Sequence, residues 1–100
     1  MSMNSAYPVI DPVATGANIK RLRIWRGLKV RDVQRWFNFE EPRAIYKWEK
    51  GQTLPSVDNL LGLSALFDVM MDEIIIRRMQ RMLMKEPERA GSFFFAFSGM

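Results

Sequence analysis

Apolar residues recur at three- and four-residue spacings through most of the chain, with polar and charged residues between them. This is the period of an amphipathic helix that buries one face. The pairs that carry the period are Ile19 and Leu22, Val33 and Phe37, Ile45 and Trp48, and Leu60 and Leu63. We find no strand pattern of comparable strength. The hydrophobic pattern therefore predicts an all-α protein.

Capping and turn residues divide this pattern into five helices. Ser and Thr are typical N-caps, Pro is typical of the first helical turn, and Gly is typical just after a helix end. The helices are expected from Thr15 as N-cap to Gly27, from about Lys29 to Phe37, from Pro42 to Gly51, from Ser56 to the break at Asp68, and from near Met71 onward. Asn38 is expected to turn the chain in a left-handed conformation, which Asn tolerates well. Two helices around a tight turn favour a helix-turn-helix domain, although a plain helical bundle fits the same spacings.

The chain has the length of one domain, with a weakly patterned segment at each end. Residues 1–14 contain two prolines and few charges, so we expect a flexible N-terminal arm. Residues 15–76 form the predicted helical domain. Residues 77–100 form a C-terminal extension, in which good helix formers continue the last helix up to Pro87 and a run of phenylalanines follows.

The composition argues against an enzyme. The chain has no cysteine and no histidine, so thiolate metal sites, disulfides and the commonest general base are excluded. No glycine-rich phosphate loop and no pair of carboxylates with supporting chemistry is present. We expect no catalytic activity, no cofactor and no bound metal.

Charge is distributed unevenly along the chain. Residues 1–53 contain ten Lys and Arg against five acids, whereas residues 54–100 contain five against six. A basic half beside a nearly neutral half is typical of a protein that binds an anionic polymer, although Lys and Arg more often only solvate helix surfaces. The N-terminus lacks the basic and apolar regions of a secretory signal, and no apolar run approaches the ~20 residues of a membrane span. We therefore expect a cytoplasmic protein.

Residues 16–76 resemble the Xre/Cro-like, or lambda-repressor-like, family of helix-turn-helix proteins, and in particular its small single-domain bacterial regulators. The segments that carry the resemblance are Asn18–Arg23 followed by Arg26–Leu28, then Val30–Gln34, then Ala44–Gly51 with its I-x-x-W-E-x-G signature, then Leu54–Leu60, and finally Met71–Ile75. They occur in the family's order and spacing. The turn at 39–42 is about one residue longer than is common in the family.

The resemblance implies a five-helix lambda-repressor-like domain that binds double-stranded DNA in a sequence-specific way, as a transcriptional regulator and most often a repressor. The third helix, at about 42–50, would lie in the major groove. The residues expected to contact bases are Arg43, Ala44, Tyr46 and Lys47. Those expected to contact phosphates are Lys29, Val30, Arg31, Gln34, Lys50, Gln52 and Thr53. Arg23 and Glu49 are expected to form a structural pair that orients the third helix.

Each of these residues also has a simpler structural interpretation. The outward side chains of the third helix could serve only to solvate an exposed surface. Asp72 and Glu73 are expected to complement a helix dipole in the first turn of the last helix rather than to bind a metal. The pattern does not decide whether Trp25 and Trp36 are buried.

The C-terminal extension allows several roles. Met79, Met82 and Leu83 give an adaptable apolar side, and Arg77, Arg78, Arg81 and Lys85 give a basic side. This segment could pack on its own domain or on a second copy in a homodimer, lie on a membrane surface, or have no role. An alternative function follows: an antitoxin-like module that holds a partner protein through residues 77–100.

Overall fold

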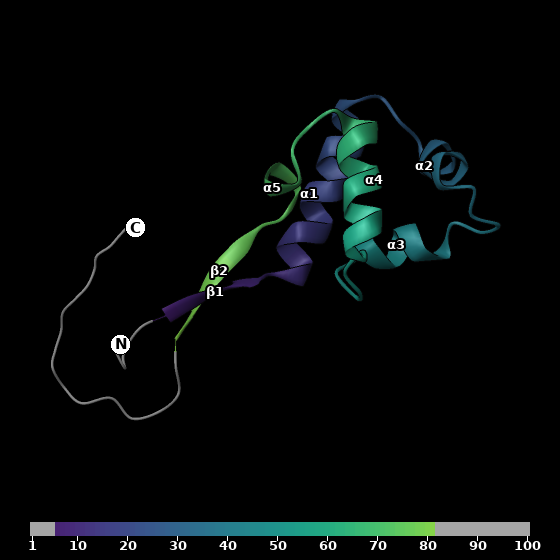
Figure 1. The fold of residues 1–100 in the computed structure, drawn as a ribbon. Coiled ribbons are helices and arrows are strands. Elements are labelled where there is room, and N and C mark those ends of the chain that lie inside the picture. The colour runs from purple at the N-terminus through teal and green to yellow at the C-terminus, as the bar shows by residue number, and fades with distance from the viewer. Residues whose placement is uncertain (1–5, 82–100) are drawn as a thin grey trace, which may run out of the picture. The chain divides into compact units, whose positions relative to one another are not determined.

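The computed structural model describes residues 6–81, which form five helices and two strands (Figure 1). The elements in chain order are β1 (Ala6–Ile10), α1 (Pro12–Trp25), α2 (Val30–Phe37), α3 (Arg43–Glu49), α4 (Val57–Phe67), α5 (Met71–Ile74) and β2 (Arg77–Arg81). The five predicted helices are therefore confirmed. The expectations for the aromatic run and for Met82, Leu83 and Lys85 lie outside the described residues.

The first helix begins earlier than predicted. Its N-cap is Asp11, whose carboxylate accepts a hydrogen bond from the Ala14 N–H at 3.0 Å, and Pro12 takes the first helical position. An Asp–Pro step is a strong start signal, because Asp satisfies a free N–H and Pro loses none. Thr15 is therefore not the N-cap but a buried residue inside α1. The expectation of a flexible arm over 1–14 is wrong for residues 6–14, which form β1 and the start of α1.

A strand, β2, replaces the predicted helical start of the C-terminal extension. β1 and β2 pair in a two-stranded sheet. The Asp11 N–H donates to the Ile76 carbonyl at 2.8 Å, and because Asp11 follows β1 while Ile76 precedes β2, the strands run antiparallel. The Thr15 hydroxyl donates to the Ile76 carbonyl at 3.2 Å and accepts from the Ile76 N–H at 2.9 Å. These bonds come from residues more than sixty positions away, so the helix propensity of 77–81 does not decide their structure.

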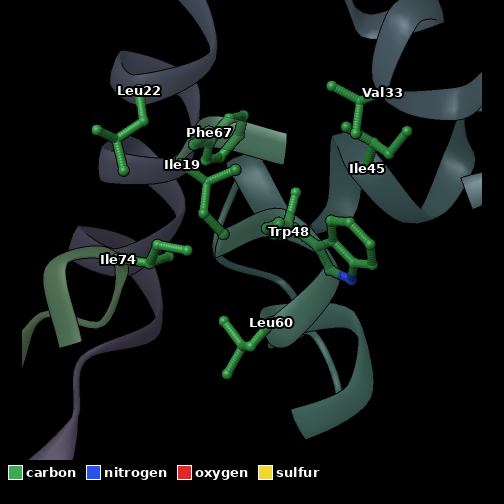
Figure 2. Packing of buried hydrophobic residues seen from close by; sticks show 9 residues of the cluster. Ile19, Leu22, Val33, Ile45, Trp48, Leu60, Phe67 and Ile74 are labelled. Carbon is green, nitrogen blue, oxygen red and sulfur yellow. The ribbon is translucent and has the colours of Figure 1, made fainter. Parts of the chain in front are cut away.

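One hydrophobic core holds the helices together within the compact unit of residues 10–77 (Figure 2). All five helices contribute to it. Its buried side chains are Ile19, Leu22, Val33, Ile45, Trp48, Leu60, Leu63, Phe67 and Ile74. The inward faces predicted for α1, α3 and α4 are thus confirmed, and Val33 supplies the buried residue of α2.

The turn between α2 and α3 is held by aromatic rings. Asn38 has φ 59° and ψ 39°, the left-handed conformation predicted for it. The rings of Phe37 and Phe39, which flank it, stack with centroids 5.1 Å apart, and both meet Trp48 edge-on at 5.7 and 6.0 Å. This contact ties the long turn to α3.

The other two tryptophans lie at the surface. Trp36 is half exposed, and its indole N–H donates to the Gly62 carbonyl at 3.0 Å. Trp25 is more exposed, with the Arg26 guanidinium 4.4 Å from its ring centroid. Each ring thus has one polar or cationic contact at the surface.

Candidate nucleic-acid interface

α3 turns one face into the core and leaves the opposite face exposed. Ile45 and Trp48 are 0% and 4% exposed. The Pro42 carbonyl opens the helix by accepting from the Ile45 and Tyr46 N–H groups at 3.0 and 3.2 Å. Because a helix advances about 100° per residue, Arg43, Tyr46 and Lys47 project well away from the direction of Ile45. Three of the predicted base contacts, Arg43, Tyr46 and Lys47, are accordingly exposed.

The exposed face of α3 forms a shallow depression of about 380 Å³. Its lining residues are Glu41, Pro42, Arg43, Tyr46, Lys47, Lys50 and Gln52. The structure thus brings three predicted base contacts together with two predicted phosphate contacts. Ala44 differs from them, because it is half-buried and packs against the core, which limits the surface it can offer to a base.

Arg43 forms an ion pair that the sequence analysis missed. Its Nη2 atom lies 3.2 Å from Oε1 of Glu41, and the two side chains are 72% and 61% exposed. An exposed pair of this kind contributes about 0–1 kcal/mol, so it biases the position of the arginine without fixing it. The sequence feature that could have predicted this pair is an acid two positions before an arginine, with a proline between them.

The N-terminus of α2 carries an acid beside the predicted phosphate contacts. The Asp32 carboxylate accepts from the Lys29 N–H at 2.7 Å, so this backbone donor is not available for a ligand. Lys29 and Arg31 are exposed, whereas Val30 is half-buried and packs against the core. A phosphate here would lie close to a carboxylate, so Lys29 and Arg31 would have to bind it through their side chains.

Three further predicted phosphate contacts are partly used within the protein. The Gln34 amide nitrogen donates to the Phe39 carbonyl at 3.2 Å, which braces the turn before α3. The N–H groups of Gln52 and Thr53 donate to the Lys47 carbonyl at 2.9 and 3.5 Å. The expectation that this loop offers its N–H groups to phosphate is therefore wrong at these two residues, because they complete the end of α3; their side chains remain exposed.

Arg23 of α1 and Glu49 at the end of α3 form a two-point ion pair. The Nε and Nη2 atoms of Arg23 lie 2.7 and 3.0 Å from the two carboxylate oxygens, and Nη1 donates to the Leu28 carbonyl at 3.1 Å. The side chains are only 11% and 6% exposed. The hydrogen bond to Glu49 raises the pKa of Arg23, and burial of the guanidinium opposes this only in part. The pair joins the end of α3 to α1.

Gly16 was not among the predicted site residues, but it sets how closely α1 approaches α3. A Cβ atom built at this position would overlap the carbonyl oxygen of Trp48 and would lie 2.9 Å from that of Glu49. A larger residue would therefore push the end of α3 away from α1. A glycine inside a helical pattern was the available signal, since it usually marks close packing.

Neither a metal site nor a membrane helix is found in the part of the chain that the structure describes. Residues 6–81 contain no cluster of three acids that could hold a metal ion, and none of their helices is long and apolar enough to cross a membrane. Asp72 and Glu73 lie in the first turn of α5, where the Glu73 carboxylate accepts from the Met70 N–H at 3.2 Å. Helix capping is thus the observed role of Glu73.

A short helix seated on a helical core, with a cationic outer face and a fixed turn before it, defines a DNA-binding protein of the transcription-regulator class. The chain belongs to the helix-turn-helix family, in its Xre/lambda-repressor-like branch, since the family's sequence model matches residues 19–74. No curated protein sequence matches the chain.

Two solved structures share the fold. The chain is similar to the restriction-modification controller protein C.AhdI from Aeromonas hydrophila, with 25% identity and a TM-score of 0.59 over 64% of this chain and 96% of that one. It is also similar to the DNA-binding domain of BldD, with 19% identity and a TM-score of 0.58 over 66% of this chain and 94% of that one. The second likeness concerns the fold alone.

Proposed function

We propose that this protein binds a specific double-stranded DNA sequence by placing α3 in the major groove. The observation that carries the proposal is the division of α3 into a buried face, with Ile45 and Trp48, and an exposed face that lines one cationic depression. The major groove is wide enough to admit a helix and displays a distinct pattern of donors and acceptors for each base pair. The similarity to C.AhdI, a restriction-modification controller protein, supports a regulatory role.

Base contacts are assigned to the exposed residues of α3. The fork of Arg43 matches the O6 and N7 acceptors of guanine, and Lys47 lies one helical turn further on, on the same face. Tyr46 can donate to an acceptor or place its ring on a thymine methyl group. Ala44 keeps a minor role, because its methyl group is half-buried.

Phosphate contacts are assigned mainly to side chains around this helix. They are Lys29, Arg31, Lys50, Gln52 and Thr53, all exposed. Gln34 has one further amide hydrogen to donate, and Val30 can contribute only its backbone N–H. Such contacts position a protein on DNA without reading the sequence.

We further propose that the protein acts as a repressor that occludes polymerase, and that it binds as a homodimer on a nearly palindromic site. A two-fold dimer presents two recognition helices to two half-sites. Transcription from a promoter that contains the selected site should fall as the protein is added. An increase would overturn the repressor role while leaving DNA binding intact.

Selection from a random duplex pool tests the main proposal. It should be run at about physiological salt, where binding driven only by counterion release is weak. The wild-type protein should enrich one motif, and the Arg43→Ala/Lys47→Ala variant should lose or relax it. The matched control is Lys20→Ala/Arg35→Ala, which removes the same charge from exposed positions of α1 and α2 outside the depression. Absence of any motif, or equal loss in both variants, would refute readout by α3.

A further inference from the structure

Glu41 places a carboxylate on a surface that otherwise carries cations. It lines the depression beside Arg43, Lys47 and Lys50 and pairs with Arg43 at 3.2 Å. Duplex DNA carries about one negative charge per 1.7 Å of its axis, so a carboxylate in such an interface is repelled by the backbone. Glu41 therefore opposes general affinity for DNA, and any benefit from it has to lie in its effect on Arg43.

The geometry between the two residues is set by Pro42. The proline ring restricts its own φ, observed at −84°, and its carbonyl accepts the first hydrogen bonds of α3. The proline thus limits the backbone conformations available between Glu41 and Arg43. The carboxylate can restrain a long side chain that would otherwise sample many rotamers.

The ion pair leaves the arginine able to bind a base. A guanidinium has five N–H donors, and the observed contact to Glu41 uses Nη2. Donors remain for the O6 and N7 acceptors of guanine while the contact to Glu41 persists. The same contact holds the positive charge of Arg43 beside a negative charge, which makes it a poorer partner for a phosphate.

We propose that Glu41 is a specificity-determining positioning residue: it orients Arg43 toward guanine and withholds it from phosphates on other sequences. This inference rests on the proposed function, in which α3 reads the major groove. It deepens that function by assigning a role to a residue that does not itself need to contact DNA.

The test compares Glu41→Gln with Glu40→Gln. Glu40 is the exposed neighbour, and it forms no ion pair with any residue in the range 6–81, so its substitution removes the same charge without freeing Arg43. Affinities for the selected duplex and for an unrelated duplex are measured by fluorescence anisotropy over a series of salt concentrations. Thermal unfolding checks that both variants fold like the wild type, as expected for exposed positions.

On the unrelated duplex, Glu41→Gln should steepen the slope of log affinity against log salt by about 0.9, because Arg43 gains one phosphate contact. Its affinity for that duplex should rise roughly two- to fivefold above that of Glu40→Gln, the range that an exposed ion pair can supply. Affinity for the selected duplex should not rise in step, so the ratio of specific to non-specific affinity falls. In an Arg43→Gln background, Glu41→Gln and Glu40→Gln should behave alike.

Equal shifts by Glu41→Gln and Glu40→Gln on both duplexes, with Arg43 present, would overturn the inference alone. A wild-type protein that prefers no sequence would overturn the proposed function, and this inference with it. A Glu41 effect that persists in the Arg43→Gln background would show that the carboxylate acts by its own charge and not through the arginine.

Discussion

The ion pair between Arg23 and Glu49 supports a sharp prediction about stability. The Arg23 side chain is 11% exposed in the native structure, and the substitution Glu49→Ala leaves its guanidinium with the Leu28 carbonyl as its remaining partner. A buried ion pair that loses one partner costs about 3–5 kcal/mol, because the remaining charge has been removed from water without compensation. Both side chains are largely but not completely buried, so we expect a loss toward the lower end of this range.

The free energy of unfolding, measured by urea denaturation followed by circular dichroism, checks this prediction. Glu49→Ala should lose about 3–5 kcal/mol, while the double variant Arg23→Met/Glu49→Met should recover most of that loss, because apolar residues of similar size need no partner. As a control, Glu41→Ala breaks an exposed pair and should lose less than about 1 kcal/mol. A loss at Glu49 no larger than this control, or a double variant as unstable as Glu49→Ala, would refute the reasoning.

Three further predictions concern backbone contacts and turns. Gly16→Ala should destabilise the fold by about 1–3 kcal/mol, because its methyl group overlaps the end of α3, whereas Ala17→Ser at the exposed neighbour should stay within about 0.5 kcal/mol in the same urea assay. Asn38 has φ 59°, which glycine adopts without strain and alanine does not. The thermal unfolding midpoint of Asn38→Gly should therefore equal or exceed that of the wild type, and the midpoint of Asn38→Ala should be lower. Equal midpoints for the two variants would show that this turn is not strained for alanine. Thr15→Val should cost about 1–3 kcal/mol and speed hydrogen exchange at the Ile76 amide, which loses its buried acceptor; unchanged exchange there would contradict the assigned bond.

Helical periodicity was sufficient for the helices and for the face that α3 exposes. Ile45 and Trp48 lie three residues apart, and that spacing predicts which side of the helix is buried whatever it packs against. Ser56 shows the same locality: its hydroxyl accepts from the Asn59 N–H at 3.1 Å, as an N-cap should. Cap, turn and period signals involve neighbours a few positions apart, so they can be recognised in a sequence.

The predictions from sequence were wrong where contacts with distant segments override local secondary-structure propensity. Residues 77–81 favour a helix by composition, yet they form β2. The residue before them, Ile76, is hydrogen-bonded to Asp11 and Thr15 at the other end of the domain. A hydrogen bond between residues this far apart produces no periodic pattern in the sequence. It also outweighs a helix propensity of a few tenths of a kcal/mol per residue.

The sequence by itself determined the class of the protein, the five helices, and the cationic character of the helix that faces outward. Only the three-dimensional structure decided which donors around that helix remain available, because the same polar groups also bond to near neighbours within the fold. Gln34 braces a turn, the N–H groups of Gln52 and Thr53 close α3, and Arg43 is paired with Glu41. Availability depends on the distances and angles between groups, and these are set only when the chain has packed.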